Sequence, residues 1–166
     1  MMSWLEYLLS KAVSTAAEWH RGQIDKSGFP YCEHLDRVSV YAQETASKYG
    51  YSSEDGLKCA IVGFLHDIIE DTEMTEDGLK ILGFPDAITA SVVALTRKDG
   101  ESYGEFVKRA SEDKYGRIVK YADLKDHLDI SRFRKLEKDD IDRLNKYLKW
   151  YHYLEEIVLD KLYDDA

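Results

Sequence analysis

Four ionisable side chains lie within six positions at the end of an apolar run: His66, Asp67, Glu70 and Asp71 follow residues 61–65. At 3.6 residues per turn, His66 and Glu70 share one face of a helix, as do Asp67 and Asp71. Burying such groups without a partner costs several kcal/mol, whereas a bound divalent cation offsets most of that penalty. The cluster therefore predicts a metal-dependent hydrolase. The alternative is a solvated helix end whose acids face water.

Two further residues of the same chemical kind lie far from this cluster along the chain, His34 and Asp123. With His66 and Asp67 they would supply two imidazoles and two carboxylates. A mixed set of nitrogen and oxygen ligands suits Mn, Fe, Zn or Co better than calcium. Spacing alone does not bring these residues together, and each has a structural alternative. His34 could cap a helix, and Asp123 could be one more acid on an amphipathic helix.

Composition and charge narrow the possible partners. The 166 residues, 44% of them hydrophobic and 33% charged, suit one globular domain over residues 1–166. The net charge of −9 argues against nucleic acid as a partner, because phosphate backbones are bound by clustered Lys and Arg. An anionic small molecule would need basic groups gathered locally. No run of apolar residues is long enough to span a membrane, and Cys32 and Cys59 suggest no disulfide framework, so a cytoplasmic protein is expected.

Helical periodicity dominates on both sides of the only two prolines, Pro30 and Pro85. We therefore predict an all-α fold, a single helical bundle of about seven or eight helices without strands. The helices that must position the candidate ligands are expected at about residues 32–48, 53–67 and 117–130. A long amphipathic helix is expected over residues 138–162, and it leaves a homo-oligomer possible.

Several short segments follow one another in a specific order: Lys26-Ser27-Gly28-Phe29-Pro30-Tyr31, His34, His66-Asp67-Ile68-Ile69-Glu70-Asp71-Thr72 and Lys120-Tyr121-Ala122-Asp123-Leu124. In this order and at these separations the chain resembles the HD-domain phosphohydrolases. Among them it is most similar to the RelA/SpoT-type domain that hydrolyses guanosine tetraphosphate and pentaphosphate, (p)ppGpp, and to its small stand-alone relatives. The resemblance covers about residues 11–131. The His-Asp pair alone is a weak signal, but the longer string with the upstream Lys-Ser-Gly-x-Pro-Tyr segment is specific.

The resemblance implies four ligands to a divalent metal, usually manganese: His34, His66, Asp67 and Asp123. It also implies that Glu70 and Asp71 form an acidic pair beside the attacking water. A cation lowers the pKa of a bound water and polarises a phosphate oxygen, and a carboxylate within hydrogen-bond reach then takes the proton. We expect Glu70 to be this base and Asp71 to orient the water.

Lys26 and Ser27 match loop positions that hold the substrate in the family. A lysine beside backbone N–H groups freed by Gly28 would suit a phosphate, although a mobile surface lysine is the alternative. Two residues depart from the family pattern. Asp25 occupies a position that commonly carries a basic residue, and His127 replaces the Asn of the family's Asp-Arg-Leu-His-Asn segment. His127 lies one helical turn after Asp123, where it could donate a hydrogen bond to the substrate or approach the metal.

The leading hypothesis is a metal-dependent phosphohydrolase that acts on a nucleotide, with guanosine 3′-pyrophosphate derivatives as the first substrate. Synthesis of such nucleotides is not expected. Asp25 and His127 keep open a rival substrate, a simpler nucleotide cleaved by an HD-type nucleotidase. A module that binds metal and nucleotide without catalysis is a third possibility. The complete acidic pair, Glu70 and Asp71, argues against it.

Overall fold

The structure is a computed structural model of the chain, which describes the backbone of residues 1–164 and the side chains of residues 1–158. Within this range the regular secondary structure is helical, apart from one isolated bridge between Ile24 and Pro30. The predicted all-α fold is confirmed. The last two residues of the expected domain, 165–166, lie outside the described residues.

The helices follow one another as α1 (Trp4–Trp19), α2 (Tyr31–Lys48), α3 (Ser53–Leu65), α4 (Ile68–Asp71), α5 (Glu76–Ile81), α6 (Asp86–Ala94), α7 (Tyr103–Glu112), α8 (Gly116–His127) and α9 (Lys138–Asp164). A 3₁₀ turn, η1 (Ile130–Arg132), lies between α8 and α9. Only two residues separate α3 from α4, and with these counted as one interrupted helix the described α-helices number eight. The long final helix is found where it was expected. No described helix is both long and apolar enough to cross a membrane.

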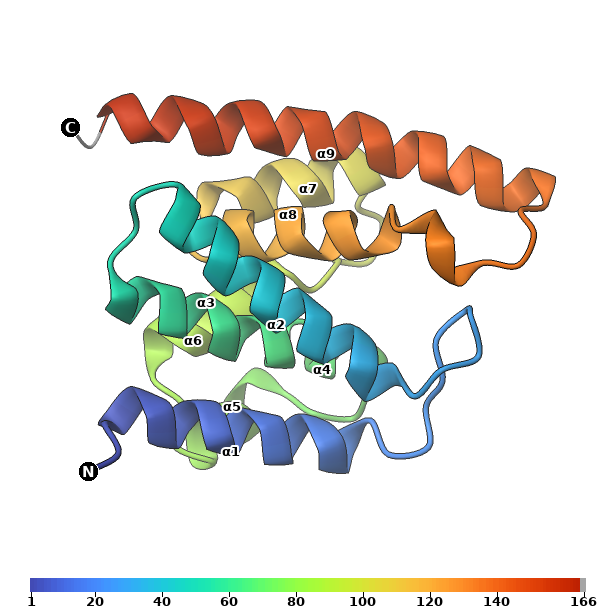
Figure 1. The fold of residues 1–166 in the computed structure, drawn as a ribbon. Helices are drawn as coiled ribbons and strands as arrows, with labels where there is room; N and C mark the ends of the chain where they lie inside the picture. The colour runs from blue at the N-terminus through green and yellow to red at the C-terminus, as the bar shows by residue number, and fades with distance from the viewer. Residues whose placement is uncertain (165–166) are drawn as a thin grey trace.

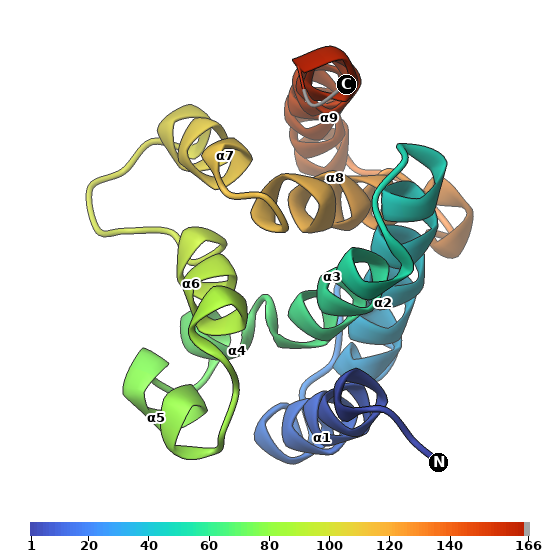
Figure 2. The ribbon, with the colours of Figure 1, turned by 90° about the vertical axis from the view of Figure 1, so that its left-hand side faces the viewer.

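Three inner helices, α2, α3 and α8, form the centre of the fold. α2 packs against both α3 and α8, while α1 covers α3 and α9 covers α8. In Figure 1, α9 lies along the top and α1 along the bottom, with the inner helices between them. The view turned by 90° shows α4, α5 and α6 grouped on one side of this stack (Figure 2). The inner helices carry fully buried side chains, among them Leu35, Ile61, Leu65, Ile118 and Leu124. Packing therefore determines where the candidate ligands on these helices lie.

The central helix begins at a side-chain cap and is interrupted at the ionisable cluster. The side chain of Ser52 accepts a hydrogen bond from the N–H of Asp55 at the start of α3. α3 ends at Leu65, and after two non-helical positions the chain resumes as the four-residue α4. The helix expected over about residues 53–67 is thus found with its end two residues earlier, and the expectation that His66 and Glu70, like Asp67 and Asp71, share a face of one helix is wrong. The interruption places His66 and Asp67 at a helix junction in the interior.

Gly63 allows α2 and α3 to approach one another closely. A Cβ atom on Gly63 would lie 2.8 Å from Cα of Ser39, a backbone atom that cannot rotate away. The Ser39 hydroxyl in turn donates to the carbonyl of Ala60 across the same contact, at 3.0 Å. The same helix pair brings the rings of His34 and His66 to a centroid distance of 5.4 Å. The close approach of α2 and α3 therefore sets the spacing of two candidate ligands.

Replacing Gly63 with Ala is expected to destabilise the protein by about 1–3 kcal/mol, because the added methyl group forces the two helices apart. Thermal unfolding followed by circular dichroism measures this effect. Gly56→Ala is the matched control on the same helix. Its Cβ would meet only Cγ of Gln43 at 3.6 Å, so Ala, the better helix former, should leave stability unchanged or slightly raised. Equal melting temperatures for the two variants would contradict the close-approach argument.

Candidate metal centre

The side chains of His34, His66, Asp67 and Asp123 meet between α2, the junction of α3 with α4, and α8. Nε2 of His66 lies 2.9 Å from Oδ2 of Asp67 and 3.7 Å from Oδ1 of Asp123. Nε2 of His34 lies 3.8 Å and 3.4 Å from the same two oxygens. The four residues come from three separate parts of the chain, and the packing of the inner helices brings them together.

Three buried atoms at this point have no hydrogen-bond partner in the part of the chain that the structure describes: Nε2 of His34, Nε2 of His66 and Oδ1 of Asp123. Buried polar atoms are nearly always paired, because an unpaired one keeps the full cost of its lost hydration. These atoms face a common point and are not aligned with one another as donor and acceptor. Imidazole nitrogens and carboxylate oxygens converging in this way suit a divalent transition metal. The residues present therefore fit a cation.

Asp126 binds Nδ1 of His34, the ring nitrogen that faces away from the centre. Its Oδ2 accepts a hydrogen bond from Nδ1 of His34 at 2.7 Å, and its side chain is fully buried. Nε of Arg37 and Nη1 of Arg132 donate to the other oxygen, Oδ1, at 2.6 and 2.8 Å. Because the proton of His34 lies on Nδ1, the lone pair of Nε2 faces the centre. A carboxylate behind a ligating histidine fixes its tautomer and its orientation, which is the role that Asp126 can fill here.

The other three residues are also held by neighbours. Nζ of Lys120 donates to Oδ2 of Asp123 at 2.8 Å, and Nδ1 of His66 lies 2.7 Å from the carbonyl of Gly63. Lys120 is itself buried, with its ammonium group 4.7 Å from the ring centroid of Phe106. The Tyr31 hydroxyl donates to Oδ2 of Asp67, the oxygen that also faces the two histidine rings. Each candidate ligand is thus oriented by a neighbour, and His66 and Asp123 keep an unpaired inner atom for the shared point.

The electrostatics of the centre favour positive charge. Burial alone would lower the pKa of His66, but Asp67 and Asp123 raise it to about 10. Burial opposes the charged form of His34 too, yet the neighbouring carboxylates of Asp123 and Asp126 raise its pKa well above the usual value. For Asp123 burial acts in the opposite direction, and Lys120 holds the pKa of this carboxyl well below its usual range. Ionised carboxylates beside rings that favour the charged form mark a place where a cation is stable.

Glu70 and Asp71 lie on α4 and line the same cavity as Asp67 and Asp123. Oε2 of Glu70 accepts the backbone N–H of Arg97 at 2.9 Å, which ties α4 to the loop before α7. Burial raises the pKa of Asp71, and the negative charges of Asp67 and Glu70 raise it further. A carboxylate with a raised pKa accepts a proton more readily near neutral pH. Both residues therefore line the cavity that adjoins the candidate metal centre, and Asp71 has the raised pKa.

Two adjoining cavities surround the centre. One, of about 330 Å³, has the acidic pair and several basic side chains in its wall, Lys26, Arg97, Lys120 and Lys146. The other, of about 270 Å³, has the apolar side chains of Ile24, Phe133 and Leu144 beside Arg132 and Arg143. Five residues line both cavities: Lys26, Tyr31, Asp71, His127 and Tyr147. The two spaces are thus adjacent parts of one site, one strongly charged and one partly apolar.

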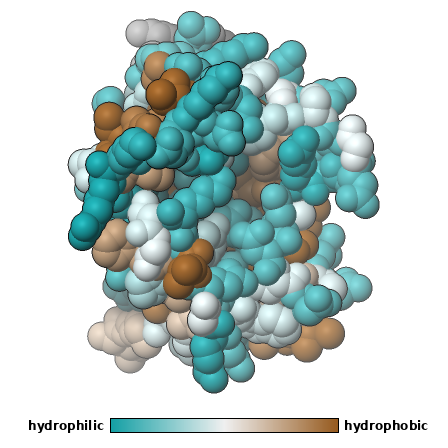
Figure 3. All heavy atoms as spheres, turned by 90° about the vertical axis from the view of Figure 1, so that its right-hand side faces the viewer, coloured by the Kyte–Doolittle hydropathy of each residue, from teal (hydrophilic) through white to brown (hydrophobic). Residues whose placement is uncertain are grey.

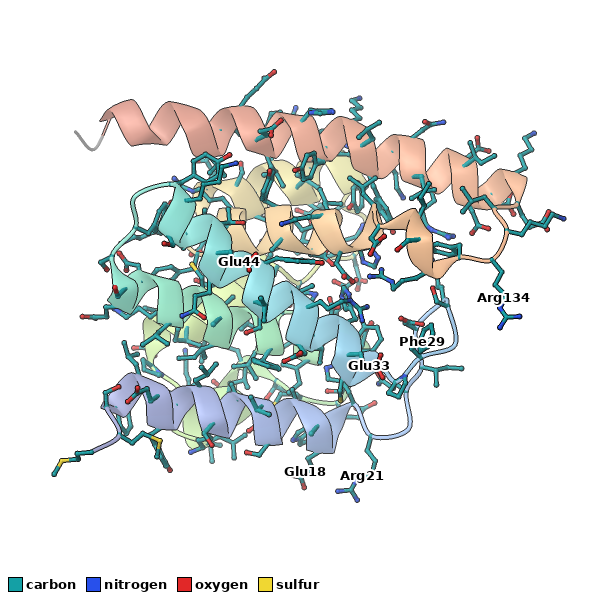
Figure 4. All side chains as sticks on the ribbon, viewed as in Figure 1. Glu18, Arg21, Phe29, Glu33, Glu44 and Arg134 are labelled. Carbon is teal, nitrogen blue, oxygen red and sulfur yellow. The ribbon has the colours of Figure 1, made fainter. Side chains whose placement is uncertain are left out.

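Two loops frame this site at one end of the molecule, residues 20–30 and 128–137, which lie on the right in Figure 1. Phe29 and Arg134 mark these loops in Figure 4, with Glu33 of α2 close to the first. Figure 3 views the molecule from this end, where hydrophilic side chains predominate and a few hydrophobic ones lie between them. A ligand would therefore enter between two loops that are carried by a rigid helical scaffold.

Positive groups gather at the site although the whole chain carries a net charge of −9. Burial lowers the pKa of Lys26, and the nearby Arg143 lowers it further. The pKa of Lys146 is lowered by burial and then by Arg97 and Lys26. Cations that lower one another's pKa in this way create a local field that attracts an anion. Arg143, Lys146 and Tyr147 all come from α9, which the sequence analysis interpreted only as an amphipathic packing helix. Lys146 and Tyr147 follow Arg143 by three and four residues, so the three side chains share one face of the helix. This spacing was the signal in the sequence that they could line one site.

The loop that carries Lys26 and Ser27 is organised by Asp25. Its Oδ1 accepts the N–H groups of Ser27 and Phe29 at 2.8 and 3.0 Å, and its carbonyl accepts the N–H of Gly28 at 3.0 Å. The expectation that backbone N–H groups near Gly28 are free for a phosphate is therefore wrong, because Asp25 uses them. The side chains of Lys26 and Ser27 nevertheless line the site, as predicted positions for substrate contacts.

Asp126, Arg37 and Arg132 were not predicted from the sequence as residues of the site. Asp126 lies one turn after Asp123, and that spacing was the available signal. His127, in contrast, was singled out, and the structure places its Nε2 3.0 Å from Oδ1 of Asp123. His20 is buried at the end of α1, with Nδ1 2.7 Å from Oε1 of Gln23.

Comparison with known proteins identifies the family. The family model for the HD domain matches residues 31–150, which include all four candidate ligands. The chain belongs to the HD domain family. The resemblance found in the sequence is thereby confirmed, and the HD domain accounts for most of the helical bundle described above, from α2 into α9.

Relatives of this HD domain are much longer proteins. The chain is 30% identical over 143 residues to a GTP pyrophosphokinase of Streptomyces coelicolor, and the match covers 80% of this chain and 16% of that protein. It is 36% identical over 95 residues to a probable guanosine-3′,5′-bis(diphosphate) 3′-pyrophosphohydrolase of Mycoplasma pneumoniae, with 57% of this chain and 12% of that protein covered. The chain thus spans less than a fifth of the length of these curated relatives.

One solved structure matches the HD domain over nearly its whole length. It is described as a metazoan ortholog of SpoT that hydrolyzes ppGpp, and it matches with a TM-score of 0.70 at 21% sequence identity. The match covers 95% of this chain and 94% of the other. The likeness supports the helical fold.

Replacing Asp126 with Asn is expected to weaken divalent-metal binding about 10–100-fold, because the neutral amide no longer fixes the tautomer of His34. Calorimetric titration with Mn²⁺ measures the affinity. Arg132→Gln is the matched control, since it removes one donor to Asp126 and leaves the contact between Asp126 and His34 in place. It should change the affinity much less. Equal losses in both variants would show that Asp126 acts through the loop and not through His34.

Proposed function

We propose that this HD domain is a metal-dependent phosphohydrolase that acts on a nucleotide. The single observation that carries the proposal is the convergence of buried, unpaired imidazole and carboxylate atoms on one point, beside an acidic pair and under a ring of basic side chains. We assign the metal to His34, His66, Asp67 and Asp123. Manganese is the first candidate, with Fe, Co and Zn as alternatives, because the ligand set mixes nitrogen and oxygen.

A cation held by His34, His66, Asp67 and Asp123 would supply Lewis acidity, which would lower the pKa of a water molecule and polarise a phosphate oxygen. The backbone N–H of Arg97 holds the Glu70 carboxylate in place. Glu70 accepts the proton of the attacking water, while Asp71 orients that water. Lys26, Arg97 and Lys146 bind phosphate oxygens and stabilise the negative charge that develops on them. Water is the nucleophile, so no covalent intermediate with the protein forms.

We propose a guanosine 3′-pyrophosphate derivative of the ppGpp type as the first substrate. Two of the relatives carry the name guanosine-3′,5′-bis(diphosphate) 3′-pyrophosphohydrolase, which states this reaction. The shape of the site agrees with it. The walls of Ile24, Phe133 and Leu144 suit a base and its ribose, while the adjoining charged cavity suits more than one phosphate. A cytoplasmic location and a possible homo-oligomer stay predictions from the sequence.

A simpler nucleotide is the rival substrate, and the observation that favours it is His127. This residue lines both cavities and lies against Asp123, where the family pattern has an Asn. Asp25, the other departure, no longer supports the rival strongly. Its Oδ1 is turned into its own loop, and Oδ2 lies 3.9 Å from Nη2 of Arg37, so its charge is compensated within the protein.

Replacing Glu70 with Gln is expected to preserve metal binding and to lower turnover about 10²–10⁴-fold, because the proton acceptor is lost. The assay follows phosphate and pyrophosphate release by ³¹P NMR from ppGpp, a deoxynucleoside monophosphate and a phosphorylated dinucleotide, with Mn²⁺ added. Asp71→Asn is measured in parallel. Full activity in Glu70→Gln with loss in Asp71→Asn would transfer the role of base to Asp71. A wild-type protein that binds metal and nucleotide but cleaves none of the panel would be a binding module.

Replacing Lys146 with Gln is expected to raise KM about tenfold for a nucleotide that carries a pyrophosphate, because one charge-assisted contact with a phosphate is lost. The value of kcat should change little, and the KM of a monophosphate should change less. Lys149→Gln is the matched control, since Lys149 lies one turn further along α9 and lines neither cavity. Equal effects of the two substitutions would indicate a general field and not a contact with the substrate.

A further inference from the structure

We infer that His127 is a fifth protein ligand of the metal centre and that it shifts the preference of the centre towards metals that favour nitrogen ligands. The inference rests on the proposed function, because it adds a residue to the same centre. His127 is the last residue of α8, one helical turn after Asp123.

The position of the His127 nitrogen carries the inference. Its Nε2 lies 3.0 Å from Oδ1 of Asp123, the oxygen that is also 3.4 Å from Nε2 of His34. Oδ1 has no hydrogen-bond partner of good geometry among the described residues, and of the three histidine nitrogens around it that of His127 lies nearest. Ligand atoms of His34, Asp123 and His127 all lie within 4.8 Å of one another. His127 therefore places its nitrogen within ligand distance of two of the unpaired atoms, Nε2 of His34 and Oδ1 of Asp123.

The distances match those between ligands of a single ion. Two atoms that each lie about 2.1 Å from one metal are about 3.0 Å apart at a right angle and about 3.4 Å apart at a tetrahedral angle. The separations of 3.0 Å and 3.4 Å from Oδ1 of Asp123 to the two ring nitrogens agree with these values.

Aromatic packing holds the His127 ring in this orientation. The ring lies between those of His34 and Tyr147, at centroid distances of 4.9 and 5.2 Å and interplanar angles of 32° and 31°. Tyr147 belongs to α9, so the long final helix supports the ring from the outside. These tilted ring contacts restrict rotation of the imidazole, so Nε2 can face the metal centre without a hydrogen bond from a carboxylate behind the ring.

A fifth ligand of this kind changes the chemistry of the centre. His127 raises the number of imidazoles from two to three beside the two carboxylates. Affinity for nitrogen-containing sites increases from Mn²⁺ through Fe²⁺ to Co²⁺, and softer or nitrogen-preferring ions gain most from an added imidazole. The centre should therefore discriminate against manganese more strongly with His127 than without it.

The test compares wild type with His127→Phe, which keeps the stacked ring and removes the nitrogen. Metal-free protein is titrated calorimetrically with Co²⁺ and with Mn²⁺, and the visible absorption of the Co²⁺ form is recorded. We expect His127→Phe to lose at least about tenfold in affinity for Co²⁺, less for Mn²⁺, and to change the Co²⁺ spectrum. His152→Phe is the control. It removes an exposed imidazole of α9 and should alter neither measurement.

A second variant, His127→Ala, guards against a packing effect of the larger ring. Free imidazole added to its Co²⁺ form should restore the wild-type spectrum, which a merely structural role of His127 would not produce. Unchanged Co²⁺ affinity and spectrum in both variants would overturn the inference and leave the proposed function standing. A wild-type protein that binds no divalent cation would contradict the proposed function itself, and so the two failures are distinguishable.

Discussion

The cost of burying imidazole and carboxylate atoms without partners governs this structure. His34, His66 and Asp123 are almost completely shielded from water, and each directs an atom without a hydrogen-bond partner in the described structure towards the same point. Asp126, the Gly63 carbonyl and Lys120 bind the outer atoms of these side chains, so only the inner atoms remain. An arrangement of this kind is stable when a cation occupies the point, because the cation replaces lost hydration for all of the inner atoms at once.

Different parts of the fold supply the candidate metal ligands and the groups placed for a substrate. The candidate ligands come from the inner helices α2 and α8 and from the junction of α3 with α4, where close packing at Gly63 leaves little freedom. The groups placed for a substrate lie in the loops at one end and on α9. These elements build a local positive field on an acidic protein, so an anion is attracted to one place on a surface that otherwise repels it.

Two neighbouring residues at the end of α8, Asp126 and His127, lie next to the candidate metal ligands. Asp126 accepts from His34 and binds Arg37 and Arg132, while His127 places a nitrogen beside Asp123. Asp126 thus lies behind one candidate ligand, and His127 lies beside another. Asp25, the other departure from the family pattern besides His127, organises its own loop. Of these two departures, His127 is the one that lies at the candidate metal centre.

The sequence by itself determined the all-α fold, the long final helix and the acidic string from His66 to Asp71, because helical periodicity and short motifs are local properties. It pointed to His34 and Asp123 only through family resemblance. The tertiary structure alone decided that these residues meet, that Asp126 lies behind His34 and that Arg143, Lys146 and Tyr147 of α9 line the site. His34 and Asp126 are 92 positions apart in the chain, and no local pattern encodes a contact that exists only after distant helices have packed.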